Sequence, residues 1–392
     1  MSPSDAPETA VSRGDAPVNY TCSQRARDGK PGSRSTAHRK ARHRVRDLSI
    51  AATEWNRGIH RGSDRTWRSN RPVAATGLGR HSFEGATMTI GMAGMGRMGA
   101  NMARRLRKAQ MEVVAYNRTP AVTQALAQEI GVAAAASLAD MVARLTPPRL
   151  VWLMLPSGQV TEDAVEELAA LLGRGDVVVD GGNSFYKDSL RRAQKLSERG
   201  IQFVDAGVSG GIWGLAEGYC LMVGGPKEAL DRVKPYLRAL APSPDTGWLH
   251  CGPVGSGHFV KMVHNGIEYG MMQSLAEGLS LLAARKEFDL DLGAVAELWR
   301  HGSVVRSWLL DLTADFLRTD QRLGEIEPYV SDSGEGRWTA LEAVELGIPT
   351  PVMSLALMMR FASQGANDYT AKLLAMMRKG FGGHAVREEG TP

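Results

Sequence analysis

Four polar side chains recur at helical spacing within the otherwise apolar segment HFVKMVHNGIEYG, residues 258–270. They are Lys261, His264, Asn265 and Glu268. A helix of about 3.6 residues per turn would place them on one face, because they follow the i, i+3, i+4, i+7 pattern. The segment would then present a base, an amide and an acid together, as acid–base chemistry on a polar substrate requires. A solvated stripe on an amphipathic helix is the ordinary alternative.

The residues around this polar face argue against a merely solvated stripe. Apolar side chains would occupy most of the remaining helix surface: Phe259, Val260, Met262, Val263 and Ile267. A helix that is apolar nearly all round is usually buried, and ionisable groups there need partners or a chemical task. We therefore expect a buried helix whose polar face is functional.

A glycine-rich turn follows the first apolar strand expected after Met88. The sequence MTIGMAGMGRMGANMARRLRK begins with a strand at residues 89–92 and continues through Gly-x-Gly-x-x-Gly into a helical pattern. Such glycines permit a tight turn, close approach of a pyrophosphate and packing of the helix on the sheet. The positive end of that helix would meet the phosphates. The residues assigned to this dinucleotide site are Gly94, Met95, Gly96, Arg97, Met98 and Gly99.

The second expected strand, residues 112–116, ends about twenty residues beyond the glycines, where the ribose of the adenosine half is recognised. Asn117, Arg118 and Thr119 follow it. A carboxylate usually holds NAD at this position, whereas this chain offers arginine and small polar groups. This favours NADP over NAD. A solvated arginine at the strand end is the alternative.

Further apolar runs alternate with helical patterns. The runs RLVWLMLPSG, DVVVDGGNS and QFVDAGVSGG each end in glycine or small polar residues. Because the carboxyl ends of parallel strands line the ligand crevice of an open sheet, these ends are expected to face one cleft, although any one of them could be only a turn. These ends are Leu155, Pro156, Ser157, Asn183, Ser209, Gly210 and Gly211, of which the first four are assigned to the cofactor.

After residue 254 long helical patterns replace the strands, so we place a domain boundary near Gly255. Three parts are expected. Residues 1–87 form a disordered basic extension, and residues 88–254 form an α/β Rossmann-like domain with a doubly wound, mostly parallel sheet. Residues 255–392 form an all-α domain.

The net charge of +5 is concentrated in the extension. Residues 1–87 hold 16 Lys and Arg against 8 Asp and Glu, whereas the remaining residues hold 31 against 34. A segment so rich in Arg, Ser and Gly cannot bury a core, and we expect it to have no role in the chemistry. Translation from Met88 is the favoured explanation, with a nucleic-acid arm and a transit peptide as alternatives.

The three cysteines, Cys22, Cys220 and Cys251, have neither paired nor metal-type spacing. This indicates a reducing compartment and argues against a disulfide framework or a zinc site. No window has the unbroken apolar length that a membrane helix requires. We expect a soluble cytoplasmic protein that binds neither nucleic acid nor membrane.

Five motifs distributed from Met88 nearly to the C-terminus point to one family. They are DGGNS (180–184), GVSGG (207–211), KMVHNGIEYG (261–270), RWTALEAVELGIP (337–349) and FGGH (381–384). These motifs resemble decarboxylating 6-phosphogluconate dehydrogenase in its short form. The resemblance implies oxidative decarboxylation of 6-phosphogluconate to ribulose 5-phosphate and carbon dioxide, with reduction of NADP or NAD and no metal.

The resemblance also implies roles for individual residues. Lys261 would be the general base that takes the proton from the C3 hydroxyl as hydride passes to the nicotinamide, and Glu268 would protonate C1 of the enediol. Burial beside the positive nicotinamide would lower the pKa of Lys261 and favour its neutral form. The substrate would be bound or oriented by Asn183, Ser209, Gly210, Gly211, His264, Asn265, Tyr269, Arg360, Arg378 and His384.

Arg360, Arg378 and His384 match phosphate and substrate ligands of the family. Arginine suits a dianionic phosphate because its fork of donors forms paired hydrogen bonds, although ordinary surface charges are the alternative. His384 would complete the site of a neighbouring subunit, which implies a homodimer or homotetramer. The resemblance thus makes residues 255–392 the domain for substrate binding and dimerisation. Ser333 stands where the long enzymes have a lysine, so one phosphate contact is absent or supplied differently. Pro156 replaces a lysine of the long enzymes near the cofactor, which leaves the choice between NADP and NAD open.

Two other functions compete. A β-hydroxyacid dehydrogenase of the 3-hydroxyisobutyrate type would share the architecture, the GVSGG-like turn and a lysine with an asparagine four residues on, without decarboxylation. Glu268, Asn183 and the arginine and histidine near the C-terminus separate the two. The alternative of another class is a nonenzymatic NADP-binding sensor whose basic tail binds nucleic acid, which salt-dependent DNA binding would reveal.

Overall fold

The alternation of apolar runs produces one mixed sheet. The computed structural model describes residues 89–365, 368–382 and 385–386, all of which belong to a single compact unit. The expectations for residues 1–87 and for His384 lie outside the described residues. Among the described residues, no helix combines the length and the apolar character needed to cross a membrane.

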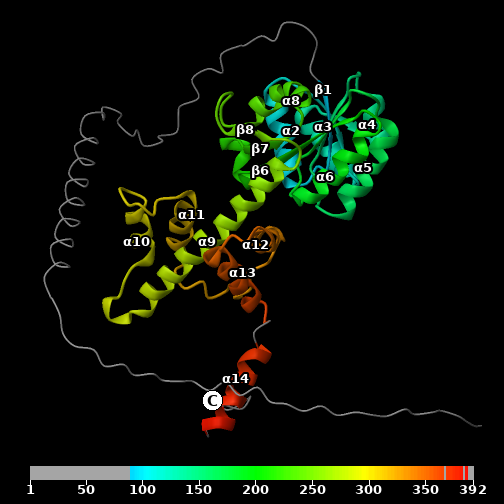
Figure 1. The fold of residues 1–392 in the computed structure, drawn as a ribbon. Helices are drawn as coiled ribbons and strands as arrows, with labels where there is room; N and C mark the ends of the chain where they lie inside the picture. Colours follow the sequence, from blue (N-terminus) through cyan, green and yellow to red (C-terminus); the bar gives the residue numbers. More distant parts are fainter. Residues whose placement is uncertain (1–88, 366–367, 383–384, 387–392) are drawn as a thin grey trace, which may run out of the picture. The chain divides into compact units, whose positions relative to one another are not determined.

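The strands form one sheet that helices flank (Figure 1). This sheet has eight strands in the order β3-β2-β1-β4-β5-β6-β7-β8. All neighbouring strands are parallel except β6 and β7. The strand order reverses between β1 and β4, which is the topological switch point at which open sheets bind ligands. The predicted doubly wound, mostly parallel sheet is confirmed. The strands are β1 Thr89–Ala93, β2 Glu112–Tyr116, β3 Ala133–Ala135, β4 Leu150–Leu153, β5 Val177–Asp180, β6 Gln202–Ser209, β7 Cys220–Gly224 and β8 Trp248–Gly252.

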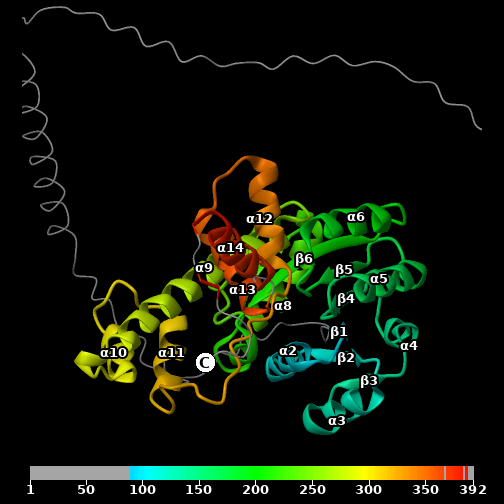
Figure 2. The same cartoon turned by 90° about the horizontal axis from the view of Figure 1, so that it is seen from below.

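Helices cover both faces of this sheet because successive strand residues point to opposite faces (Figure 2). Val177 and Val179 pack into a core with residues of α2 and α8, whereas Val178 packs into a second core with residues of α4, α5 and α6. The strands are therefore continuous apolar runs. The helices of this part are α2 Arg97–Lys108, α3 Pro120–Ile130, α4 Leu138–Ala143, α5 Gln159–Leu171, α6 Tyr186–Ser197, η1 Gly211–Trp213, α7 Gly214–Glu217 and α8 Lys227–Leu240.

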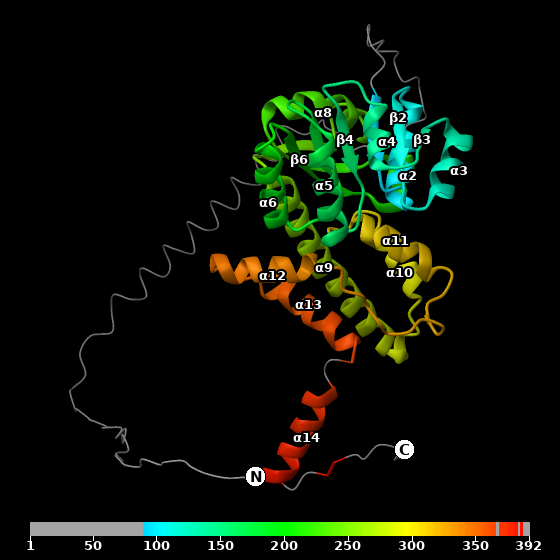
Figure 3. The same ribbon diagram turned by 90° about the vertical axis from the view of Figure 1, so that its right-hand side faces the viewer.

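The 29-residue helix α9 (Ser256–Ala284) connects the sheet to the helical part (Figure 3). At its start, a Cβ on Gly257 would lie 2.4 Å from the carbonyl oxygen of Met222, so glycine permits direct packing on the strand backbone. Further along, Leu279 packs with residues of α10 and α11. The predicted all-α C-terminal part is confirmed. Its other helices are η2 Lys286–Phe288, α10 Leu292–Trp299, α11 Trp308–Leu317, α12 Glu335–Leu346, α13 Pro351–Ser363 and α14 Asp368–Gly382.

Helix α9 is less buried than its sequence predicts. Lys261 and Met262 face the interior, but Val260 is 39% exposed and Ile267 is 51% exposed. The expectation of a helix buried nearly all round is therefore wrong for this side of α9. The reason is tertiary: the sheet, α12 and α13 pack on α9, and they leave Val260 and Ile267 uncovered.

Candidate active site

The glycine turn after β1 has the shape that a pyrophosphate requires. Gly94 has a φ of +94°, and a Cβ on Gly99 would lie 2.0 Å from the Gly94 carbonyl oxygen, so the turn and the packing of α2 both need glycine. A Cβ on Gly96, by contrast, would meet no heavy atom within 4 Å. This open space adjoins the N-terminus of α2, whose first turn contains no acidic residue. The turn therefore fits the phosphates of a dinucleotide.

The residues after β2 support this turn. The Met95 backbone N–H donates to Asn117 Oδ1 at 3.0 Å, and Asn117 Nδ2 donates to the Thr119 carbonyl oxygen at 3.3 Å. Arg118 is exposed beside them. The structure thus brings together the predicted cofactor residues of β1 and β2. The hydrogen bond from Met95 also shows that Asn117 stabilises the glycine turn, which was not predicted.

The loops after β4 and β5 are adjacent, as predicted. A Cβ on Gly182 would lie 2.6 Å from the Leu155 carbonyl oxygen. Pro156 and Ser157 are exposed in the first loop, and Asn183 is exposed in the second. The predicted crevice residues of these two strands therefore lie at one edge of the sheet.

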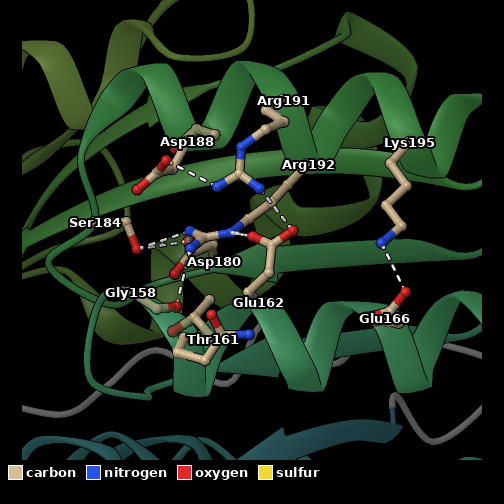
Figure 4. Close-up of polar contacts among 12 residues, drawn as sticks. Gly158, Thr161, Glu162, Glu166, Asp180, Ser184, Asp188, Arg191, Arg192 and Lys195 are labelled. Atoms are coloured by element: carbon tan, nitrogen blue, oxygen red, sulfur yellow. Dashed lines mark hydrogen bonds and ion pairs between the residues drawn. The ribbon is translucent and has the colours of Figure 1, made fainter. Parts of the chain in front are cut away.

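A buried arginine connects these two loops. Arg192 of α6 donates to Asp180 Oδ2 at 3.0 Å and to Ser184 Oγ at 3.2 Å at the end of β5. It also donates to the Gly158 carbonyl oxygen at 3.4 Å in the loop after β4, and to Glu162 Oε2 at 3.1 Å on α5 (Figure 4). Arg192 and Asp180 are both 0% exposed.

Sequence reasoning missed Arg192. The helical spacing of Ser189, Arg192 and Leu196 could have revealed it, because this spacing places all three residues on one face of α6, which is buried. An arginine on a buried helix face requires an acidic partner. The loop motif DGGNS supplies that partner in Asp180.

The polar face of α9 forms a connected group, as predicted. Lys261 Nζ donates to Asn265 Oδ1 at 2.7 Å, and His264 Nδ1 donates to the same oxygen at 3.0 Å. The amide nitrogen of Asn265 donates to Glu335 Oε1 at 3.1 Å. Glu335, at the start of α12, was not predicted. The sequence offered only a glutamate in SDSGEGRWT, about seventy residues away from its partner.

Lys261 lies against the end of the sheet. Lys261 is 8% exposed, and a Cβ added to Gly207 of β6 would lie 2.3 Å from the Cβ of Lys261. Burial lowers the pKa of Lys261, while the negative charges of Glu268 and Glu335 oppose this effect more weakly. Lys261 therefore loses its proton more readily than an exposed lysine does, which suits a base.

The turn after β6 connects α9 to the dinucleotide helix. Ser209 Oγ lies 3.4 Å from His264 Nε2, and Glu268 Oε2 lies 3.9 Å from His264 Nδ1. On the other side of the turn, Asn101 of α2 donates to the Ile212 carbonyl oxygen at 3.5 Å. The turn that contains Gly210 and Gly211 is thus bounded by both helices, so the polar face of α9 and helix α2 meet there.

A second polar group contains Tyr269 and Arg360. The Arg360 guanidinium carbon lies 3.4 Å from the centre of the Tyr269 ring, and Arg360 Nη1 donates to the Ser331 carbonyl oxygen at 2.8 Å. The Tyr269 hydroxyl lies 3.3 Å from Ser333 Oγ. Arg378 is exposed on α14 and, in the described part of the chain, forms no hydrogen bond or ion pair with these residues.

Two family models match the chain. The NAD binding domain of 6-phosphogluconate dehydrogenase matches residues 89–252, and the 6-phosphogluconate dehydrogenase C-terminal domain matches residues 257–388. A relative from Haloferax volcanii, named NAD(+)-dependent, decarboxylating 6-phosphogluconate dehydrogenase, is 42% identical over 300 residues. That alignment covers 76% of this chain and 98% of the relative.

Solved structures agree with this match. The 6-phosphogluconate dehydrogenase of Plasmodium falciparum, solved in apo form and with NADP+ or 6-phosphogluconate, has a TM-score of 0.66 and 29% identity, with 78% of this chain and 67% of that chain covered. A 3-hydroxyisobutyrate dehydrogenase of Salmonella typhimurium has a TM-score of 0.60 and 22% identity over 71% and 95% of the two chains, and it shares the fold. Because both domain models match and together span most of the chain, it belongs to the 6-phosphogluconate dehydrogenase family, in its short form.

Proposed function

We propose that the chain catalyses the oxidative decarboxylation of 6-phosphogluconate to ribulose 5-phosphate and carbon dioxide, with NADP as the preferred acceptor and NAD as the alternative. The observation that carries this proposal is the group of Lys261, His264 and Asn265 beside the turn after β6. The names of the relatives support the same reaction.

The buried amine provides the first proton transfer. Neutral Lys261 accepts the proton of the C3 hydroxyl at Nζ, and the bound dinucleotide supplies the acceptor for the hydride that leaves C3. Asn265 Oδ1 holds the amine from one side. The resulting β-keto acid loses carbon dioxide because its ketone accepts the electron pair of the breaking bond. Glu268, whose side chain is 40% exposed, then donates the proton that C1 requires.

The substrate contacts follow from the polar groups that border this face. Asn183, Ser209, Gly210 and Gly211 would hold the sugar acid, and Tyr269 with Arg360 would hold its phosphate. The stacking of Arg360 on Tyr269 supports the phosphate assignment because it orients the guanidinium while leaving donors available.

The proposed assembly is a homodimer or homotetramer in the cytoplasm. His384 would then reach the site of a neighbouring subunit, and Arg378 would bind the substrate. Exposed apolar side chains on α9, α12 and α13, three helices that contact one another, support a second copy as a partner, because a large exposed apolar patch typically marks a protein–protein interface. Examples are Ile267, Val344 and Leu355. We place the domain boundary near Gly255 and assign residues 1–87 no role in the reaction.

The preference for NADP rests on Arg118. It is exposed at the end of β2, where a 2′-phosphate would lie. The Haloferax volcanii relative is named NAD(+)-dependent, so NAD is the comparison to make.

The decisive experiment compares initial rates and carbon dioxide release from 6-phosphogluconate with NADP and with NAD. Lys261→Met is expected to lower kcat by about 10²- to 10⁴-fold, as loss of a general base does, with unchanged dinucleotide affinity. Lys195→Met, a change of an exposed lysine on α6, serves as the control. Full activity of the Lys261→Met variant would exclude Lys261 as the base. Oxidation of 3-hydroxyisobutyrate without carbon dioxide release would favour the β-hydroxyacid dehydrogenase, and a thousandfold preference for NAD would contradict the role of Arg118.

A further inference from the structure

Glu335 is an unexplained buried acid beside the proposed base. It is the first residue of α12 and is 2% exposed. Its Oε1 accepts the hydrogen bond of Asn265, but its Oε2 is buried and has no hydrogen-bond partner among the described residues. A buried carboxylate with an unpaired oxygen is costly, so its retention requires a reason.

The hydrogen bond to Glu335 determines which way the Asn265 amide points. An ionised carboxylate can only accept, so the amide nitrogen of Asn265 must face Glu335. The amide oxygen then faces the other way, where Lys261 Nζ and His264 Nδ1 both donate to it. Without Glu335, Asn265 could turn its amide nitrogen toward the amine, where it would repel the protonated amine or donate to the lone pair with which neutral Lys261 must accept the proton of the substrate.

The charge of Glu335 also acts on the amine. Burial lowers the pKa of Lys261, and negative charge on Glu268, Glu335 and Cys220 raises it. Among these, only Glu335 is also joined to Lys261 through a shared hydrogen-bond partner, Asn265. Glu335 is therefore connected to Lys261 both by geometry and by charge.

We propose that Glu335 is a positioning residue of the active site, which fixes the Asn265 amide so that its oxygen holds Lys261 Nζ beside the turn after β6. This inference rests on the proposed function in one respect, the role of Lys261 as the base. The competing explanation is that Glu335 only stabilises the N-terminus of α12, where an acid is favourable.

The test uses two variants and a control on the same helix. Glu335→Gln keeps an acceptor for Asn265 and removes the charge, whereas Glu335→Leu removes both. Glu345→Gln changes a glutamate whose side chain is 60% exposed near the other end of α12. We expect Glu335→Leu to lower kcat by about a hundredfold, as misplacement of a reacting group does, without changing dinucleotide affinity. We expect Glu335→Gln to keep kcat within about threefold at high pH, because the acceptor is retained.

The pH dependence separates positioning from helix stabilisation. Lys261 must be neutral to act, so kcat/KM rises with pH through its pKa. Removing the negative charge of Glu335 lowers that pKa, so the acidic limb of Glu335→Gln should move to lower pH while that of Glu345→Gln stays in place. A lower melting temperature with an unchanged acidic limb would overturn the proposal.

A double-mutant cycle with Asn265→Ala tests the path. If Glu335 acts through Asn265, Glu335→Leu should have little further effect on kcat in the Asn265→Ala background. Independent, additive losses would contradict the proposed path. If the Glu335→Leu variant does not fold, the position of the acidic limb of kcat/KM in the Glu335→Gln variant tests the proposal instead.

Competitive acetylation of Lys261 with acetic anhydride, followed across pH by peptide mass spectrometry, needs no substrate. Glu335→Gln should shift the labelling curve of Lys261 to lower pH. A shifted curve in a protein that does not turn over 6-phosphogluconate would refute the proposed function and retain the connection between Glu335 and Lys261. An unshifted curve in an active enzyme would refute that connection alone.

Discussion

Replacing Arg192 with methionine should destabilise the chain strongly, because it would leave buried acid without its cation. Removing one partner of a buried ion pair typically costs about 3–5 kcal/mol. Asp180 would keep two donors, the Gly182 N–H at 3.0 Å and the Ser184 hydroxyl at 2.8 Å. Glu162 would keep Arg191. We therefore expect the lower end of that range, about 3 kcal/mol.

The assay is equilibrium unfolding in urea, with the free energy of unfolding obtained from the midpoint and the slope. Arg191→Met is the matched control, because Arg191 also pairs with Glu162 but its side chain is 55% exposed. Exposed pairs contribute about 0–1 kcal/mol, so this control should be nearly neutral. Combining Arg192→Met with Asp180→Asn should recover part of the loss, since the unpaired charge is removed.

The same variant should weaken dinucleotide binding, because Arg192 connects the loops after β4 and β5. Fluorescence titration with NADPH measures this effect. A loss of stability below about 1 kcal/mol, or one equal to that of Arg191→Met, would refute the argument that Arg192 and Asp180 form a consequential buried pair.

Two further predictions concern Lys261. Gly207→Ala would place a Cβ 2.3 Å from the Lys261 Cβ, so kcat should fall by at least about tenfold with unchanged dinucleotide affinity, whereas Gly278→Ala, where a Cβ meets no atom within 4 Å, should be neutral. Equal kcat values for Gly207→Ala and Gly278→Ala would contradict this prediction, because they would show that displacing the Lys261 amine does not slow the reaction. In the wild type, neutral Lys261 is the active form and its pKa is lowered from 10.5, so kcat/KM should rise with pH on a limb whose midpoint lies below 10.5. Initial rates across pH measure this limb, and a midpoint at or above 10.5 would contradict the proposed base.

Local features of the sequence were sufficient for the elements and for much of the site. The strand at residues 112–116 and the glycine turn after residue 93 were predicted correctly, because alternation, apolar runs and glycine act over a few residues. The grouping of Lys261, His264 and Asn265 was also predictable, because helical geometry alone brings residues three and four apart together.

Tertiary structure decided the features that depend on distant partners. Glu335 contacts Asn265 from a separate helix, and Arg192 reaches Asp180 and Gly158 from α6. No local periodicity encodes such pairs, since they exist only after the elements pack. The exposure of Ile267 has the same origin, because an apolar pattern shows which side chains could be buried, whereas the neighbouring elements determine which of them are.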